Sequence, residues 1–582
     1  MLAKSRVDAV TLSVIWNAFV SIADEMGTAL RSTAFSEAVR EGEDFSTGLF
    51  DRHGRLIAQG NFTPGHLGSM PYVVKNALEY FPAATLHPGD GILLNDSFLG
   101  AGHFPDHFLI SPAFDRDQLI GYTVNCGHKI DVGGAAPGSQ LVTGVTEAFQ
   151  EGLRILPIRI FREGEIDKDL ERLILGNVRV PDAYIGDLIA QRNSNFLGAQ
   201  RLQRLFQASG LEVIDAAVEA ILDRSEEMVR RAIRRIPDGR YEFEDYFDDS
   251  GTGTEPIVVH VAVEVKGDEI VVDFTGSSQE VAAGMNSYIN YTRAYAMFSI
   301  KVFTEPLLAQ NEGVIRPIQV IAEPGSFFNP RFPAPSGGRA TVQIRIFDAI
   351  NGALSAVLPD RVMGAFSHWS NPNLGGVDGN GKRFVMYDLI YGGYGGKCDG
   401  DGAEALSPVL NARNIPVEVH ETNNPILVRR FEMIRDSGGA GKFRGGCGIR
   451  KEVELRAPSA VLTTLCDRHV FPPYGLFGGA PGVCATSEID NVDGTSTSIG
   501  SKCVSTVTQG QTIRLCTAGA GGYGDPFERD PKAVSTDVLD DYVSVEAARE
   551  RYGVVIDPAT CEIDHVGTQR MRASRLAAGV ER

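Results

Sequence analysis

Residues 8–35 carry apolar side chains at helical spacing. These side chains recur every three or four positions, which places them on one face of a helix: Ile15, Phe19, Ile22, Met26 and Leu30. We predict that the helix begins near Asp8 or Thr11 and ends before the polar segment 36–44. Its apolar face belongs to the core of the protein.

The pattern then changes to short alternating runs separated by Gly and Pro, which is typical of β-strands, up to about residue 180. A hairpin is predicted where the runs 47–50 and 55–58 flank the turn 51–54. Helical spacing returns between 181 and 236, in two helices divided at Ser209-Gly210. The alternating runs 257–265 and 269–274 predict a second hairpin.

Glycine clusters mark the chain beyond residue 364, at 392–396, 438–441 and 519–522, without a fixed period that would indicate a repeat. The segment 391–397 lacks the spacing and the Ser or Thr of a phosphate-binding loop, so we expect these glycines to serve tight β-turns and close backbone approach. The chain is predicted to be α+β and multi-domain. Its predicted regions are an amino-terminal metal-site region at 1–180, a helical segment at 181–236, a mixed α/β region at 237–363 and a Gly-rich, β-dominated region at 364–582.

Composition narrows the class of protein. A net charge of -19 disfavours nucleic acid and anionic membranes as partners, because both attract a basic surface. The eight cysteines include no C-x-x-C pair, and the amino terminus opens no apolar signal-peptide core. No run approaches the roughly 18 apolar residues of a membrane-spanning helix. We therefore expect a cytoplasmic protein with no nucleic-acid or membrane partner.

Metal-competent side chains gather in two short polar segments, 95–107 and 128–134. Imidazoles and carboxylates are the ligands that zinc, manganese and iron accept, and five such residues occur here: His103, Asp106, His107, His128 and Asp131. The residues therefore indicate a candidate metal site. A Gly-rich turn network without metal is the equally weighted alternative, since no H-E-x-x-H signature is present.

Spacing helps to choose among these residues. The Gly100-Ala101-Gly102 segment and Pro105 predict a tight loop after the strand 91–94, so His103 and Asp106 can reach one ion. His128 follows the alternating run 119–125, which would pair back and carry a third ligand beside the loop. His107 is expected to point elsewhere, as a hydrogen-bond partner of the site.

The sequence supports catalysis by a serine or a cysteine less well than it supports a metal site. The chain contains no G-x-S-x-G elbow, which argues against a serine hydrolase. Each cysteine is most simply a small buried hydrophobic residue, with Cys126 set apart because it lies two residues from His128.

Ordered motifs along the whole chain resemble the hydantoinase B family. This family includes the B subunits of ATP-dependent N-methylhydantoinases and lactam hydrolases, the carboxy-terminal half of 5-oxoprolinases, and the large subunit of acetone-type carboxylases. The matching segments are 41–46, 64–70, 95–106, His128 with 131–134, 311–313, 436–442 with 444–446, Asp467-Arg468 and 521–526.

The resemblance implies a site for one divalent ion, zinc or manganese. His103, Asp106 and His128 match the family's ligand pattern, and Asp44 aligns as the fourth ligand with Glu41 in reserve. His66 and Asp131 are predicted to be catalytic, with His66 as a proton carrier. The alternatives are a solvated acidic turn at 41–44 and a structural role for His66.

The resemblance also implies a partner. The Asp-x-Gly-Gly-Thr-x-Thr-Asp phosphate loop of the family's actin-like ATPase subunit, the hydantoinase A type, occurs nowhere in the sequence. We expect that partner to bind ATP and magnesium, to phosphorylate the carbonyl of a hydantoin or lactam, and to form a heterotetramer with this chain. Metal-activated water would then open the ring. The alternatives are a subunit of an ATP-dependent ketone carboxylase of the acetone or acetophenone type, and a non-catalytic scaffold with structural metal.

Overall fold

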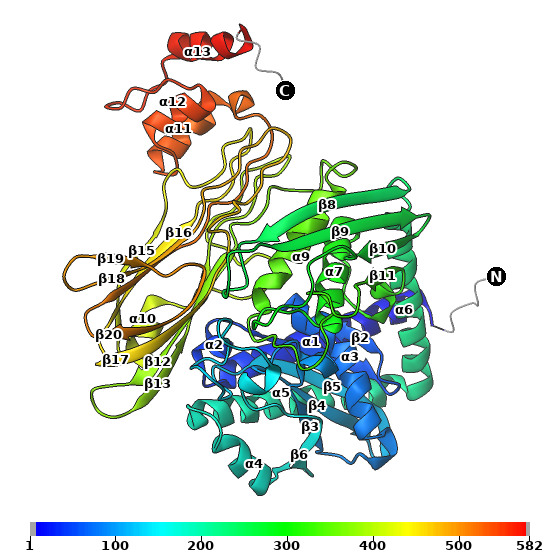
Figure 1. Ribbon diagram of the computed structural model, residues 1–582. Coiled ribbons are helices and arrows are strands. Elements are labelled where there is room, and N and C mark those ends of the chain that lie inside the picture. Colours follow the sequence, from blue (N-terminus) through cyan, green and yellow to red (C-terminus); the bar gives the residue numbers. More distant parts are fainter. Residues whose placement is uncertain (1–6, 578–582) are drawn as a thin grey trace.

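The computed structural model describes residues 7–577 and confirms the predicted α+β class. The chain first forms an amino-terminal sheet with its helices, then a central layer, and then the Gly-rich sheets (Figure 1). Small helices follow the last strand. Four sheets of seven, four, five and five strands form the framework of the described residues.

The amino-terminal sheet has the strand order β2-β1-β5-β4-β3-β6-β7, and all neighbouring strands are antiparallel. Its strands are β1 (Phe45–Asp51), β2 (Leu56–Gln59), β3 (Gly91–Leu94), β4 (Asp106–Asp115), β5 (Gln118–His128), β6 (Ile158–Arg162) and β7 (Glu165–Ile166). The first predicted hairpin is confirmed, because β1 and β2 pair across the predicted turn. β5 lies between β1 and β4, and this order later positions the candidate site.

The predicted amino-terminal helix is α1 (Ala9–Thr33), and every predicted core position on it is buried. Asp8 caps it by accepting hydrogen bonds from the backbone N–H groups of Val10 and Thr11. By length and composition alone α1 could cross a membrane, as some core helices of globular proteins could. In this structure its apolar face packs against α5 (Pro181–Ser209) and the amino-terminal sheet.

The two predicted helices between 181 and 236 are confirmed as α5 and α6 (Leu211–Ile233). Gly210 separates them with a φ of 80°, a left-handed conformation that favours glycine. α5 lies across β4 and β5, so this helical segment covers the amino-terminal sheet. Two shorter helices complete the region, α2 (Glu37–Arg40) and α4 (Lys168–Leu175).

The helix α3 (Pro64–Tyr80) lies where the sequence predicts short strands separated by Gly and Pro, so that prediction is wrong for this segment. Pro64 instead occupies the first helical position, where its missing N–H costs nothing. Gly68 allows close contact with α7 (Ile289–Thr304), since a Cβ at this position would lie 2.7 Å from the Cα of Ala294. Tertiary packing therefore selects a helix that local residue preferences disfavour.

Replacing Gly68 with alanine is expected to destabilise the protein by about 1–3 kcal/mol, because the added methyl group overpacks the contact between α3 and α7. This cost exceeds the roughly 0.5–1 kcal/mol that alanine gains over glycine in a helix. Urea unfolding measures the change. Gly253→Ala is the matched control, since nothing lies within 4 Å of a Cβ there. A Gly68→Ala variant as stable as the control would contradict this packing.

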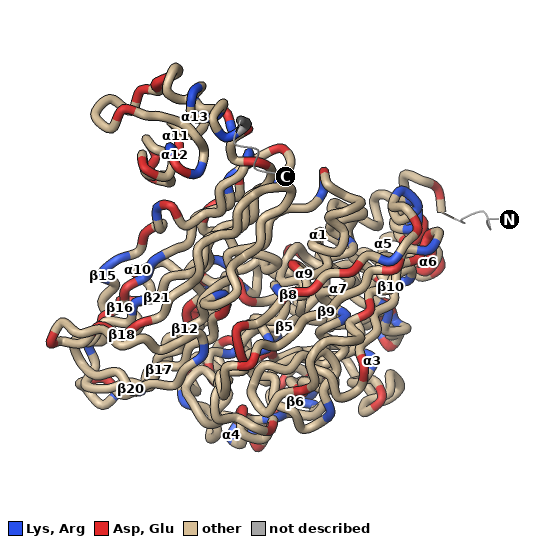
Figure 2. The backbone as a smooth tube through the Cα atoms, turned by 45° about the horizontal axis from the view of Figure 1, so that its top comes forward, with Lys and Arg blue, Asp and Glu red and all other residues tan. Residues whose placement is uncertain are grey.

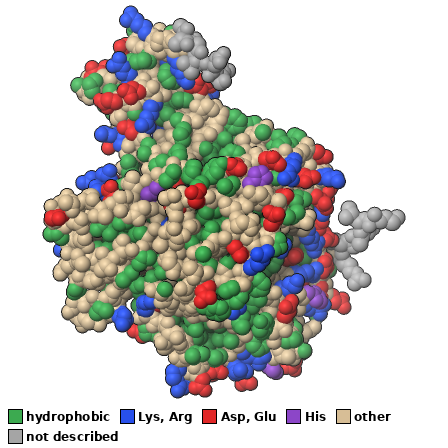
Figure 3. All heavy atoms as spheres, viewed as in Figure 1, with side chains coloured by type: hydrophobic (Ala, Val, Ile, Leu, Met, Phe, Trp, Pro, Cys, Tyr) green, Lys and Arg blue, Asp and Glu red, His purple; other side chains and the backbone are tan. Residues whose placement is uncertain are grey.

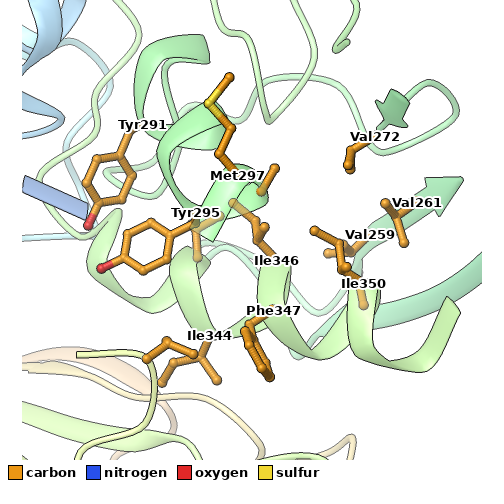
Figure 4. Close-up of a cluster of buried hydrophobic side chains, with 14 of the residues drawn as sticks. Val259, Val261, Val272, Tyr291, Tyr295, Met297, Ile344, Ile346, Phe347 and Ile350 are labelled. Atoms are coloured by element: carbon orange, nitrogen blue, oxygen red, sulfur yellow. The ribbon is translucent and has the colours of Figure 1, made fainter. Parts of the chain in front are cut away.

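The central layer joins a four-stranded sheet to two buried helices. The sheet has the order β11-β10-β9-β8, with β8 (Gly239–Phe247), β9 (Ile257–Lys266), β10 (Glu269–Asp273) and β11 (Ile318–Ile321). β9 and β10 confirm the second predicted hairpin. Figure 4 shows valines of β9 and β10 facing Ile346 and Ile350 of α9 (Ala340–Leu354). All 15 residues of α9 are buried, so this helix is a rigid support for the side chains at its start.

The Gly-rich region forms two five-stranded sheets. One contains β13-β12-β17-β20, with β14 added to β12, and the other β15-β16-β21-β18-β19. The strands are β12 (Trp369–Val377), β13 (Arg383–Tyr387), β14 (Ile390–Tyr391), β15 (Ile426–Met433), β16 (Ile449–Leu455), β17 (Ser459–Leu465), β18 (Thr486–Asp490), β19 (Ser496–Ser498), β20 (Lys502–Thr508) and β21 (Thr512–Cys516). The remaining helices are α8 (Glu312–Ile315), α10 (Val417–Asn423), α11 (Pro531–Leu539), α12 (Val545–Tyr552) and α13 (His565–Ala577).

The glycine clusters of this region lie backbone against backbone. A Cβ on Gly393 would lie 2.4 Å from the carbonyl carbon of Gly446, and one on Gly521 would overlap the carbonyl oxygen of Tyr474. Neither glycine has a positive φ. Close backbone approach, rather than turn conformation, therefore requires glycine at these positions.

Charged residues of both signs lie side by side along α6 and the neighbouring β10 (Figure 2). Arg230 of α6, for example, lies 2.9 Å from Glu226 and 3.0 Å from Asp268. Acidic neighbours therefore offset the positive charge of Arg230.

A buried cluster of charges joins α2 to the Gly-rich sheets. His420 Nε2 lies 3.0 Å from Asp388 Oδ1, and His420 Nδ1 lies 3.5 Å from Glu37 Oε1. Lys451 Nζ lies 2.6 Å from the other oxygen of Asp388. Burial alone would lower the pKa of His420, but Asp388 and Glu37 outweigh it and raise that pKa to about 9. The imidazolium is therefore the form that the fold favours.

This cluster predicts that stability declines in mildly alkaline solution. The folded pKa of His420 is above the ordinary value of about 6.5, so its contribution is complete below pH of about 6.5 and disappears as pH rises through about 9. The free energy of unfolding, measured in urea across this range, should fall more steeply for the native sequence than for His420→Gln. His565→Gln, at an exposed histidine, should keep the native slope. Identical slopes for all three proteins would contradict the assignment.

Candidate metal centre

Three adjacent strands bring candidate ligands to one edge of the amino-terminal sheet. Asp106 begins β4 and His128 ends β5, and the two residues lie directly opposite each other in the antiparallel pair. Asp44 precedes β1, and its carbonyl oxygen accepts a hydrogen bond of 3.1 Å from the backbone N–H of His128. The prediction that the strand before His128 pairs back beside the loop is confirmed.

His103 completes the group from the loop between β3 and β4. A short helical turn, Ser97–Ala101, follows β3, and the Asp96 side chain closes it by accepting from the backbone N–H of Leu99 at 2.7 Å. The predicted tight loop is therefore present. It places His103 within reach of Asp106.

The geometry of the three side chains fits a divalent ion. His103 Nε2 and His128 Nδ1 lie 2.9 and 3.1 Å from the same oxygen, Asp106 Oδ1. Two ligands of a tetrahedral zinc ion are about 3.3 Å apart, so a small expansion would admit the ion. The candidate ligand atoms of these residues lie within 4.8 Å of one another.

Hydrogen bonding also suits His103 to metal binding. Its Nδ1 lies 2.8 Å from the carbonyl oxygen of Gly337, which can only accept a hydrogen bond. Nδ1 therefore carries the proton, and Nε2 presents a lone pair toward the cluster. Burial and the charge of Arg339 lower the pKa of His103 to about 4 against the opposing effect of Asp106. The ring is neutral at physiological pH, which is the state that binds a metal.

Asp44, rather than Glu41, is the acidic-loop residue that the structure brings to this cluster. Asp44 Oδ2 lies 3.8 Å from His128 Nδ1 and accepts a 3.0 Å hydrogen bond from the Tyr387 hydroxyl. The Glu41 side chain instead pairs with Arg40 at 2.9 Å, and both are partly exposed. Asp44 is brought to the cluster because it directly precedes β1, and β1 pairs with β5, the strand that ends at His128.

His66 lies in the first turn of α3, on the other side of Asp106. Its Nε2 is 3.1 Å from Asp106 Oδ2 and 3.9 Å from Asp44 Oδ1. Together with Asp106 and Cys126 it forms a second group that could hold a metal. Burial raises the pKa of the Cys126 thiol well above its usual range, which disfavours the thiolate that would bind. The His103-Asp106-His128 group therefore has the better donor chemistry.

Asp131 and His107 have other partners. Asp131 accepts hydrogen bonds from the backbone of Gly133 and Gly138 and from Arg179 at 2.9 Å, an arrangement that fixes the loop after β5. His107 packs edge-on against Tyr184, and burial lowers the pKa of His107 to about 3. The structure does not bring these two residues into the His103-Asp106-His128 group.

Arg339 was not identified from the sequence. It precedes α9 and donates hydrogen bonds to Asp106 Oδ2 and to the Tyr291 hydroxyl. The Cζ atom of Arg339 also lies 3.7 Å from the centroid of the Tyr291 ring. Burial alone would raise the pKa of Asp106, but His103, His66 and Arg339 hold it well below its usual range. Asp106 is therefore a carboxylate, as a metal ligand must be. Arg339 is 233 positions from Asp106 in the chain, so no local signal connects them.

The cluster borders a cavity of about 10 Å³, which is about the space needed to hold one water molecule. Its wall includes residues of all three parts of the fold: Asp44, Thr63, His66, His103, Asp106, Gln140, Tyr291, Arg339, Ala340, Gln343, Trp369, Tyr387 and Leu410. The site therefore lies where the amino-terminal sheet, the helices α7 and α9, and the Gly-rich sheets meet.

Known proteins are similar to this chain over nearly its whole length. The crystal structure of the ATP-dependent caprolactamase from Pseudomonas jessenii matches with a TM-score of 0.90 and 29% identity, over 98% of this chain and 100% of that one. A protein of Pseudomonas sp. strain NS671, provisionally named as the B component of a D-/L-hydantoinase, is 32% identical over 97% of this chain and 98% of its own length.

A nucleotide-free acetone carboxylase has the same fold, with a TM-score of 0.89 over 99% of this chain and 84% of that one, at 18% identity. The sequence profile of hydantoinase B/oxoprolinase matches residues 8–526. The chain thus belongs to the hydantoinase B/oxoprolinase family.

Proposed function

We propose that this chain is the metal-bearing subunit of an ATP-dependent cyclic amidase, which hydrolyses a hydantoin or lactam ring after a partner subunit phosphorylates the ring carbonyl. The supporting observation is the buried group His103, Asp106 and His128, whose nitrogen and oxygen donors lie within 4.8 Å of one another. Family relatives named as a hydantoinase subunit and a caprolactamase support cyclic amides as the substrate class.

We assign one divalent ion, zinc or manganese, to Asp44, His103, Asp106 and His128. The ion would supply Lewis acidity to the reaction when bound. Imidazoles suit zinc and carboxylates suit manganese, so this mixed donor set accommodates either metal. A purely structural zinc site would more commonly include thiolates, whereas this donor set consists of imidazoles and carboxylates.

The residues around this group have separate tasks in the proposal. His66 carries a proton on Nε2, which lies 3.1 Å from Asp106 Oδ2. Arg339 holds Asp106 ionised and oriented, and the Gly337 carbonyl fixes the tautomer of His103. Asp131 acts through the loop that it fixes rather than on the substrate.

The proposal also includes a partner. Two relatives are named as single subunits, one of a hydantoinase and one of a caprolactamase, which implies a second subunit in each of those enzymes. We propose an actin-like ATPase of the hydantoinase A type, which binds ATP and magnesium and forms a heterotetramer with this chain in the cytoplasm, where ATP is supplied. Apolar side chains gather in several places on the face shown in Figure 3. An obligate interface buries exposed apolar side chains of this kind, and Val470 and Phe477 are among those that this chain exposes.

Copurification with the ATPase subunit, followed by assays over hydantoins and lactams, tests this function. We expect ring opening only when ATP and both subunits are present. The isolated chain should neither bind nor hydrolyse ATP in calorimetric and phosphate-release assays. Ring opening by the isolated chain without ATP, or tight ATP binding to it, would contradict the proposal.

A further inference from the structure

Besides Arg339 Nε, three buried polar atoms of residues in the wall of the cavity have no hydrogen-bond partner among the described residues: Thr63 Oγ1, Gln343 Nε2 and Trp369 Nε1. The three residues are 1%, 0% and 4% exposed. Buried polar groups are almost always hydrogen-bonded, and leaving one unpaired costs about 1–3 kcal/mol. Three such atoms around one small cavity therefore indicate a ligand that pairs with them.

The direction of the Gln343 amide follows from its neighbours. Arg339 donates a hydrogen bond to the Tyr291 hydroxyl, so this hydroxyl uses its own proton toward Gln343 Oε1, at 2.7 Å. Because the carbonyl end of the amide is held by Tyr291, its NH₂ end is the free one. Gln343 thus offers hydrogen-bond donors, and not an acceptor, to the cavity.

Trp369 can offer only a donor. It begins β12, and its ring packs against Tyr391 with a centroid separation of 5.7 Å. The indole nitrogen carries a proton and has no lone pair available for hydrogen bonding. Its partner must therefore be an acceptor.

Thr63 adds a hydroxyl, which can donate one hydrogen bond. It is the N-cap residue of α3, yet its side chain makes no capping hydrogen bond to that helix. The hydroxyl is consequently free to donate toward the cavity. The amino-terminal end of a 17-residue helix also carries partial positive charge, which favours an anion nearby.

We propose that Thr63, Gln343 and Trp369 form a binding site for an anionic oxygen of the substrate, a phosphoryl oxygen of the activated amide. The charges of the surroundings agree. Asp44 and Asp106 contribute two negative charges and Arg339 one positive charge, so the divalent ion of the proposed function, when bound, would make the site able to accept an anion. The cavity of about 10 Å³ holds one oxygen-sized atom, so the wall must open for the rest of the ligand.

This inference rests on the proposed function for the identity of the substrate, but its test needs neither ATP nor the partner. The chain has two tryptophans, Trp16 and Trp369. In a Trp16→Phe background, Trp369 is the sole tryptophan and reports directly on the cavity. Titration of the metal-loaded full chain with inorganic phosphate should shift its fluorescence saturably. Sodium formate, titrated in parallel, distinguishes a carboxylate oxygen from a phosphoryl oxygen as the preferred ligand.

Two substitutions test the donors themselves. Gln343→Glu keeps an acceptor for Tyr291 but replaces the free NH₂ by an oxygen, and we expect it to weaken phosphate binding at least tenfold. Trp369→Phe keeps the aromatic packing and removes the N–H, and calorimetry should show weaker binding of the same order. Gln207→Leu is the matched control and should bind phosphate normally, because the Gln207 amide on α5 donates to Asp115 of β4 and does not line the cavity.

The outcomes separate this site from the function on which it rests. Phosphate affinity unchanged in both Gln343→Glu and Trp369→Phe would overturn the proposed oxygen site, as would the absence of any saturable phosphate signal. Formate binding that exceeds phosphate binding would overturn the phosphoryl assignment. Intact ATP-dependent ring opening in the same variants would leave the proposed function standing while the oxygen site fails.

Discussion

Replacing His103 with alanine is expected to reduce the metal content at least tenfold and to abolish ATP-dependent turnover by the two-subunit complex. The imidazole lies 2.9 Å from Asp106 Oδ1 and is already neutral and fixed by the Gly337 carbonyl, so its loss removes a prepared ligand. Elemental analysis of the purified protein measures the metal directly.

The buried neighbour His107 offers a control for this substitution. Its ring packs on Tyr184 and is not part of the His103-Asp106-His128 group, so His107→Ala should retain metal. Circular dichroism would establish that both variants are folded. Full metal occupancy in a folded His103→Ala protein would contradict the assignment of this ligand.

Replacing Arg468 with methionine should produce the largest loss of stability, about 3–5 kcal/mol, because the buried Asp245 and Asp348 then keep a single arginine, Arg345, between them. The guanidinium lies 3.0 Å from Asp245 of β8 and 2.9 Å from Asp348 of α9, and all three side chains are buried. Arg468 itself follows β17 in the Gly-rich part of the chain. This ion pair therefore joins the central layer to the Gly-rich sheets.

Urea unfolding followed by circular dichroism measures this loss. Arg435→Met is the matched control, since Arg435 forms an exposed pair with Asp541 at 2.8 Å and such pairs contribute roughly 0–1 kcal/mol. Equal unfolding midpoints for the two variants would show that the buried arginine does not stabilise the junction.

The hydrophobic pattern of the sequence predicts the helices and strands in which apolar side chains recur at a regular spacing. The stripe from Ile15 to Leu30 became α1, and the alternating runs became the two hairpins. The helix α3 was missed because its stability comes from close packing of Gly68 on α7, a contact that no local preference encodes.

The candidate site was predictable where its residues share neighbouring strands. His103, Asp106 and His128 lie within 26 positions of one another, and the pairing of β4 with β5 brings them together. Arg339, Gln343 and Trp369 come from the central layer and the Gly-rich sheets, so only the tertiary structure connects them with the metal-competent residues. The choice of Asp44 over Glu41 likewise needed the register of β1 beside β5.

The most direct test of the proposed reaction follows isotopes through the reconstituted complex of this chain and its ATPase partner. Ring opening is measured in ¹⁸O-labelled water with ¹³C-labelled bicarbonate present, with and without ATP. The account predicts ATP-dependent opening of a hydantoin or lactam, with solvent oxygen in the new carboxylate and no carbon from bicarbonate in the product. A product in which bicarbonate carbon forms a new carbon–carbon bond would contradict hydrolysis and identify a carboxylase.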